Sequence, residues 1–392
     1  MKTIVILGDG MADEPIEALG NKTPLQAAKK PYIDLLASKG KSGLLDTIPP
    51  GFKPGSEIAN LSVLGYDVPK VFEGRGSLEA ASMEIDIEEG EMAMRCNVIC
   101  IEDGKIKNHS AGHISTEEAA ELIKFLDKEL NDGTVSLYPG VSYRHLLKMK
   151  DGNKNLDCTP PHDVIGTPFE QVMIKATTPE AEDTAKYLNE LIIKSQQLLK
   201  DHPINLKRIA EGKDPANSIW PWSPGYRPQM QTLQELYGIK SGSVISAGLK
   251  LIHVEGATGL YDTNYEGKAQ AAIDALKHDD FVYLHIEASD EAGHEGDYEL
   301  KTKTIEYLDS RVVKTIYEAT KDWDEPVTIA VLPDHPTPCH LRTHTNKPIP
   351  FLIYRSNEAG DNVQVYDEFE SAKGAYGTIV GHEFMDTLFF KK

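Results

Sequence analysis

Three short apolar segments, far apart in the chain, each end at residues that commonly bind metal ions. The segments and the residues after them are 4–7 with Asp9, 281–286 with Asp290 and His294, and 327–332 with Asp334 and His335. Short apolar runs of this kind are typical of buried parallel strands, whose carboxyl ends meet at one edge of a sheet. The chain is therefore expected to fold around an α/β sheet that gathers these side chains at one edge.

Helical patterns alternate with the strand patterns. The expected helices cover 23–39, 230–237, 268–277 and 300–319, and further strands are expected at 243–246 and 350–354. Thr23 and Pro24 are a suitable cap and first position for the first helix, and Gly40 a suitable end. The alternation predicts a mostly parallel sheet covered by helices on both faces.

The middle of the chain has a different pattern. Segments 95–102 and 105–107 flank Asp103-Gly104, a strong hairpin signal. Helices are expected at 116–130 and 179–199, with a strand-like sequence at 135–147 between them. This pattern of hairpin strands and helices predicts a smaller inserted α+β domain at 86–185, which leaves 1–85 and 186–392 as the core domain.

Composition limits the partners and the location. The 392 residues carry a formal net charge of −20, which argues against binding a nucleic-acid backbone or an anionic membrane by bulk attraction. The four cysteines show no disulfide framework or zinc knot, and no signal peptide or membrane span is evident. A cytoplasmic protein is expected, and the sequence specifies no oligomeric state.

Seven residues carry the expected chemistry: Asp9, Ser56, Asp290, His294, Asp334, His335 and His344. Singly, each has an ordinary explanation, such as a helix cap for Asp9 or Ser56. Together, three carboxylates, three imidazoles and one hydroxyl suit two adjacent divalent ions, with Mn²⁺ or Zn²⁺ favoured and Co²⁺ or Mg²⁺ also compatible. Two such ions can activate a nucleophile and hold a phosphoryl group, and metal coordination would make the Ser56 hydroxyl reactive at neutral pH.

The order Asp, Ser, DxxxH, DH and distal His resembles the alkaline phosphatase superfamily. The segments that narrow the resemblance are Gly8–Asp13, Pro54–Asp67, Phe72–Gly76, Gly256–Gly259 and Ala288–His294. They resemble the archaeal type of cofactor-independent phosphoglycerate mutases, and the resemblance covers essentially the whole chain. It implies an alkaline-phosphatase-like core that interconverts 3-phosphoglycerate and 2-phosphoglycerate in glycolysis through a phosphoserine.

The resemblance also implies roles for particular residues. Asp290, His294 and His344 would bind one metal ion, and Asp9, Ser56, Asp334 and His335 the other. Ser56 would be the nucleophile, and Lys250 would neutralise the transferring group, although the text around His253 departs from the family pattern. The inserted domain would hold a small phosphorylated hydroxy acid, with Arg144 and His145 as the first candidates and His113 and Arg95 as further ones.

Other functions remain open at this point. Bacterial chains resembling this one have been proposed as homoserine kinases of threonine synthesis, although the chain has no P-loop and no kinase-type glycine loop. A simple phosphatase or sulfatase is a third reading, but Ser56 lacks the sulfatase context. A non-catalytic metal-binding scaffold would predict a broken ligand set, whereas all seven positions are filled.

Overall fold

A computed structural model of the chain describes residues 2–83, 85–228, 230–238 and 251–390. Lys250 and the expected strand 243–246 therefore lie outside the described residues. The chain forms two compact units: unit 1 contains Met1–Val71 and Met230–Lys392, and unit 2 contains Phe72–Gln229. The division falls outside the expected boundaries of 86 and 185 on both sides.

Unit 1 is built on a six-stranded mixed sheet with the order β10-β1-β11-β12-β2-β13. The strands are β1 (Lys2–Gly8), β2 (Lys41–Asp46), β10 (Phe281–Ile286), β11 (Val327–Leu332), β12 (Ile349–Arg355) and β13 (Gly377–Val380). β1 lies between β10 and β11 and is parallel to both, whereas β12 runs antiparallel to β11 and β2. The α/β class and the mostly parallel sheet are confirmed, because β1, β2, β10, β11 and β13 run in one direction. Only β12 among the described strands of this sheet runs the other way, since it returns beside β11 without a crossover helix.

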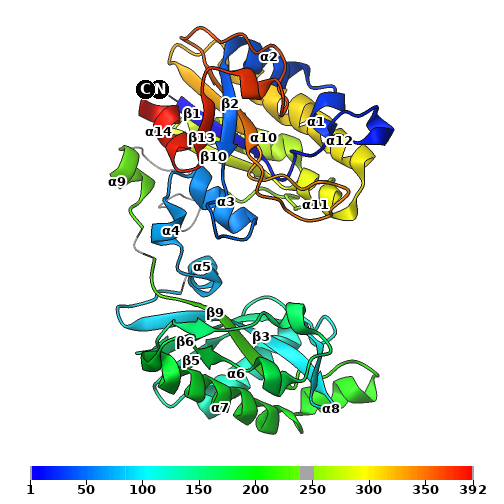
Figure 1. Ribbon diagram of the computed structural model, residues 1–392, viewed down its shortest axis with the longest axis vertical. Coiled ribbons are helices and arrows are strands. Elements are labelled where there is room, and N and C mark those ends of the chain that lie inside the picture. The colour runs from blue at the N-terminus through cyan, green and yellow to red at the C-terminus, as the bar shows by residue number, and fades with distance from the viewer. Residues whose placement is uncertain (1, 84, 229, 239–250, 391–392) are drawn as a thin grey trace. The chain divides into compact units, whose positions relative to one another are not determined.

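Helices lie on both faces of this sheet (Figure 1). One face packs Ile4 and Ile6 of β1 into a core with helices α2, α10 and α12, and Phe351 of β12 contacts Phe384 of α14 on the other. The helices of unit 1 are α1 (Pro24–Ala27), α2 (Pro31–Lys39), α3 (Ser56–Val63), α4 (Val68–Val71), α9 (Leu233–Tyr237), α10 (Tyr265–Leu276), α11 (Ala288–Glu295), α12 (Tyr298–Tyr307), α13 (Lys314–Thr320) and α14 (Glu383–Phe390), with the π-helical segment η6 (Leu308–Val313) and the short turns η1 (Glu17–Leu19) and η7 (Ser371–Lys373).

Two expected helices of unit 1 are interrupted. The segment 23–39 forms α1 and α2, because Ala28 is extended, with ψ 140°, and Pro31 begins a new helix. The segment 300–319 is continuous but widens into η6, where the Asp309 carboxylate accepts the Tyr32 and Ile33 N–H groups at 2.9 and 2.7 Å. The widened turn thus caps the start of α2.

Unit 2 is an antiparallel sheet in which β3 pairs with β4, β6 and β9, and β6 pairs with β5. Helices α6 and α7 pack on the larger core, and Ala80 of α5 packs with Ala93 and Leu146 in a smaller one; Figure 1 shows these helices on opposite sides of the sheet. The elements are α5 (Arg75–Ser82), β3 (Glu91–Glu102), β4 (Lys105–Asn108), α6 (Thr116–Leu130), β5 (Val135–Tyr138), β6 (Arg144–Lys150), β7 (Leu156–Asp157), η2 (Pro161–Val164), η3 (Phe169–Val172), β8 (Lys175–Ala176), η4 (Pro179–Ala181), α7 (Glu182–Leu199), α8 (Pro203–Ala210) and β9 (Ser218–Gly225).

Unit 2 extends past the expected insertion because α5 and β9 belong to it. Gly76 of α5 lies so close to β3 that a Cβ there would be 2.3 Å from the Ala93 carbonyl oxygen. β9 contains Pro221 and Pro224, which are tolerated in edge strands but not in central ones. In agreement with this, β9 pairs only with β3 among the described strands. No helix within the described residues is long and apolar enough to cross a membrane.

Candidate active site

Three side chains meet at the carboxyl ends of β1 and β11, as expected from the parallel strands. Asp9 and Asp334 follow these strands, and both are buried together with His335. One ligand atom from each of the three lies within 4.8 Å of the others. The His335 Nε2 atom is 3.6 Å from Asp9 Oδ1 and 3.3 Å from Asp334 Oδ2.

Ser56 joins this group as the first residue of α3. Its Oγ lies 3.0 Å from His335 Nε2. Gly55 precedes the helix, and no side chain caps it, so the Ser56 side chain is directed at His335 rather than used as a cap. The helix-cap explanation for Ser56 therefore does not apply.

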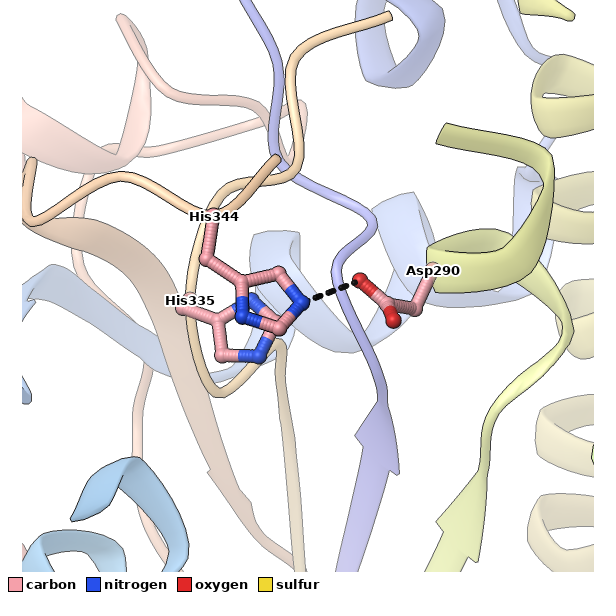
Figure 2. A group of neighbouring side chains, drawn as sticks. All are labelled: Asp290, His335 and His344. Carbon is pink, nitrogen blue, oxygen red and sulfur yellow. Dashed lines mark ion pairs between the residues drawn. The ribbon is translucent and has the colours of Figure 1, made fainter. Parts of the chain in front are cut away.

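A second group lies beside the first and shares His335. Asp290, His335 and His344 each offer a ligand atom within 4.8 Å of the others. Figure 2 shows the His335 and His344 rings over one another and His344 directed at Asp290; the ring centroids are 3.9 Å apart, and His344 Nε2 is 3.5 Å from Asp290 Oδ1.

His294 completes the second group from the next turn of α11. Its Nε2 atom is 3.2 Å from Asp290 Oδ2 and 2.8 Å from His344 Nε2. Its Nδ1 atom lies 3.0 Å from the Arg342 carbonyl oxygen, which orients the ring. Two imidazole nitrogens and a carboxylate thus converge on one point, the arrangement that a divalent ion requires.

The electrostatics of the site indicate that positive charge would stabilise it. Burial raises the pKa of Asp9 well above its usual range, and the Asp334 and Asp290 carboxylates raise it further. Burial also lowers the pKa of His335, which favours the neutral ring that a metal ligand needs. Asp9 Oδ1 is buried and has no hydrogen-bond partner among the described residues. An unpaired buried carboxylate oxygen is costly unless a cation binds it.

Asp290 and His344 are already paired with each other. Burial alone would raise the pKa of Asp290, but hydrogen bonds from His344 and Thr337 outweigh it and lower the pKa to about 2. Burial lowers the pKa of His344, yet the Asp290 carboxylate outweighs this and gives a net rise. Asp290 is therefore ionised and available as an anionic ligand.

Known proteins of one family are similar to this chain. A family model described as 2,3-bisphosphoglycerate-independent phosphoglycerate mutase matches residues 37–205. A relative of that name from Methanosarcina acetivorans is 50% identical, with 99% of each chain covered, and a probable one from Geobacter sulfurreducens is 45% identical, with 98% of each covered. The chain belongs to this mutase family.

Two solved structures are similar to this chain over nearly its whole length. A protein from Pyrococcus horikoshii is 31% identical, with a TM-score of 0.82 over 99% of this chain and 96% of that one. A cofactor-independent phosphoglycerate mutase from Thermoplasma acidophilum is 29% identical, with a TM-score of 0.71 over 99% of both chains.

The expected substrate residues of this family member lie in unit 2, in different surroundings. The Arg95 guanidinium lies 5.2 Å from the Trp222 ring centroid, with its Nε 3.1 Å from Glu79 Oε2, and the Arg144 guanidinium is exposed beside Tyr143. His113 is exposed and has a positive φ of 54°. His145 is fully buried, and its Nδ1 accepts the Gly140 N–H at 3.0 Å. Burial lowers the pKa of His145 to about 3, so this ring is neutral.

Several contributing residues were not identified from the sequence. In unit 2, the Arg75 guanidinium, like that of Arg95, lies over the Trp222 ring, 5.8 Å from the centroid. In unit 1, His285 contacts Asp9, and Asn60 contacts Asp334. His285 and Tyr283 alternate on β10 with apolar residues, and this polar alternation in an otherwise buried strand was the available signal.

Proposed function

We propose that this member of the mutase family interconverts 3-phosphoglycerate and 2-phosphoglycerate through a phosphoserine at Ser56. The observation that carries the proposal is the meeting of Ser56 Oγ with His335, beside Asp9 and Asp334, at the edge where the sheet ends. This arrangement brings a hydroxyl against a buried group of metal-ligand type. The order of these residues along the chain supports an alkaline-phosphatase-like core for unit 1.

The donor set fits two divalent ions. We assign Asp290, His294 and His344 to one and Asp9, Ser56, Asp334 and His335 to the other, with Mn²⁺ or Zn²⁺ favoured. The orphaned Asp9 Oδ1 and the converging nitrogens of His294 and His344 support this assignment. When bound, such ions supply Lewis acidity that lowers the pKa of a serine hydroxyl and neutralises a phosphoryl group.

In the proposed reaction Ser56 exchanges a phosphoryl group with glycerate. The Ser56 oxygen loses its proton and attacks phosphorus, so that an Oγ–P bond forms and the bond from phosphorus to the substrate oxygen breaks. The released glycerate oxygen takes up a proton. The other glycerate hydroxyl then loses its proton and attacks the phosphoserine, which restores Ser56. Lys250, outside the described residues, is retained as the candidate that neutralises the transferring group.

The substrate carboxylate needs a cationic partner, and unit 2 offers one. Burial lowers the pKa of Arg95; Glu79 opposes this, while the positive charges of Arg75 and Arg144 add to it. Three guanidinium groups that repel one another favour binding of an anion, and arginine binds carboxylates in bidentate geometry. We propose that Arg75, Arg95 and Arg144 bind the carboxylate of the small hydroxy acid, with His113 a further candidate. His145 supports them indirectly, because it fixes the Gly140 turn that precedes Arg144.

A coupled assay tests the proposed function. The metal-loaded protein is incubated with 3-phosphoglycerate and without 2,3-bisphosphoglycerate, and 2-phosphoglycerate is detected with enolase. Product formation by the wild type, absent in Ser56→Ala, is expected. The mutase proposal would be wrong if no product formed with Mn²⁺, Zn²⁺, Co²⁺ or Mg²⁺ while the protein phosphorylated homoserine with ATP. That result would identify a homoserine kinase instead. The relatives reported above carry the mutase name and give the kinase no support.

The four cysteines are free thiols, three of them buried, which agrees with a proposed location in the cytoplasm.

A further inference from the structure

Two polar side chains of β10 point to the same face of the sheet, toward the candidate active site. Tyr283 and His285 are two residues apart, so strand alternation places them on one face. The parallel register pairs His285 with Leu7, and the Asp9 N–H donates to the Ile286 carbonyl oxygen at 2.9 Å. The backbone of β10 therefore continues beside Asp9 and fixes where both side chains lie.

His285 holds one oxygen of the Asp9 carboxylate. Its Nε2 atom lies 2.7 Å from Asp9 Oδ2. When Asp9 is ionised, as a cation ligand must be, its carboxylate can only accept, so the ring then donates from Nε2. The other oxygen, Oδ1, has no hydrogen-bond partner among the described residues and lies 3.6 Å from His335 Nε2. The hydrogen bond thus turns the free oxygen toward the group formed with Asp334 and His335.

Tyr283 reaches the other side of the same group through Asn60. The Tyr283 hydroxyl donates to Asn60 Oδ1, which fixes the orientation of the amide. The Asn60 Nδ2 group then donates to the Ser56 carbonyl oxygen at 2.8 Å and to Asp334 Oδ2 at 3.3 Å. One amide therefore links the first turn of α3, which carries the nucleophile, to a candidate metal ligand.

We propose that Tyr283 and His285 are positioning residues, which hold Asp9, Asp334 and Ser56 in the geometry required for cation binding and phosphoryl transfer. Neither needs to touch the substrate. Hydrogen bonds behind metal ligands orient them and raise their affinity, and their loss typically costs about 10- to 100-fold in metal affinity or activity. The inference rests on the proposed two-cation site and adds that two residues of β10 set the positions of its candidate ligands.

The test of His285 compares two variants of similar side-chain size. His285→Gln keeps an N–H donor near the position of Nε2, whereas His285→Leu has none. Titration of Mn²⁺ into the metal-free proteins by calorimetry measures affinity without relying on turnover. His278→Ala is the matched control, because His278 is an exposed histidine of the same unit. Circular dichroism of the metal-free proteins shows whether each variant is folded.

The expected result is that His285→Leu binds one of two Mn²⁺ ions about 10- to 100-fold more weakly, while His285→Gln recovers most of the affinity. His278→Ala should match the wild type. Equal affinities in the folded Leu variant and the wild type would overturn the role of His285. A wild-type protein that binds no Mn²⁺ would instead refute the proposed metal site itself, so the two failures are distinguishable.

The test of Tyr283 uses steady-state kinetics of Tyr283→Phe. Because Asn60 supports Ser56 and Asp334 rather than the substrate, kcat should fall while KM stays near the wild-type value. Unchanged kcat in this variant would overturn the role of Tyr283. A rise in KM with unchanged kcat would also overturn it, since that pattern indicates lost substrate binding.

Discussion

At the scale of single residues, the candidate site is defined by which side chains share their partners. His335 belongs to both ligand groups, and its ring stacks on His344. Thr337 adds a hydroxyl that donates to Asp290 Oδ1, whereas His294 lies nearer to Oδ2. Asp290, His335 and His344 are therefore each held by a neighbouring side chain, which is typical of preorganised sites.

Removal of one imidazole should reduce metal binding. His344→Ala is expected to retain about one divalent ion per chain where the wild type retains about two, since three-ligand sites bind weakly when one ligand is lost. Metal content after gel filtration, measured by plasma mass spectrometry, checks this. His340→Ala, an exposed histidine of the same loop near Glu14, is the control and should keep the wild-type content. Two ions in both variants would contradict the assignment of His344.

Glu368 should make folding depend on pH. Burial raises the pKa of Glu368 to about 7, although Thr23 and the Asp13 N–H donate to it at 2.7 and 3.0 Å. A carboxyl whose pKa is higher in the folded state binds its proton more tightly there, so its contribution to stability falls as pH rises from about 4.3 to 7. Glu368→Gln removes this fall.

Thermal midpoints of the metal-free proteins at pH 5 and pH 8 measure the effect. The wild type should lose stability relative to Glu368→Gln between these pH values. The same difference between the two proteins at both pH values would show that Glu368 titrates normally.

At the scale of elements, a buried ion pair joins α12 to the segments that follow β1 and β11, which carry Asp9 and Asp334. Lys301 of α12 is fully buried, and its Nζ donates to the Ala12 carbonyl oxygen, to Asp13 Oδ2 and to the Thr337 carbonyl oxygen at 3.1, 2.8 and 2.8 Å. Asp13 Oδ2 also accepts the Cys339 N–H at 3.1 Å. Three donors are fully used, so the lysine ties the segment after β1 to the segment after β11.

Loss of this lysine should destabilise unit 1. Lys301→Met leaves the Asp13 charge buried and unpaired, which is expected to cost about 3–5 kcal/mol of unfolding free energy. Urea unfolding followed by circular dichroism measures the loss. Lys303→Met, an exposed lysine of the same helix paired with Glu306, should leave the midpoint unchanged. Equal midpoints for the Lys301 variant and the wild type would show that the pair contributes little.

The elements themselves could be predicted where the pattern was regular. The strands 281–286 and 327–332 and the helix 116–130 have the expected bounds, because their apolar residues follow one period without interruption. Two breaks could not be foreseen. The break at Ala28 depends on Pro31 outweighing an otherwise helical pattern, and η6 depends on the contact of Asp309 with residues distant in sequence.

At the scale of the whole molecule, the sequence indicated two units but not where they divide. The meeting of Asp9, Asp334 and His335 was foreseeable because parallel strands bring their ends together, whatever the sequence separation. The assignment of α5 and β9 to unit 2 was not, because it depends on backbone contacts of Gly76 and on a proline-containing strand. The supporting residues Tyr283, His285 and Asn60 were also missed, since only the register of β10 beside β1 brings them to the site.

The proposed phosphoserine at Ser56 can be detected directly. Metal-loaded protein is mixed with 3-phosphoglycerate, quenched in acid and digested, and the peptide that contains Ser56 is analysed by mass spectrometry. A phosphoryl group is expected on Ser56 in the wild type, with no modification and no turnover in Ser56→Ala. Turnover of phosphoglycerate by Ser56→Ala, or a phosphoryl group on a different residue during turnover, would contradict the phosphoserine mechanism.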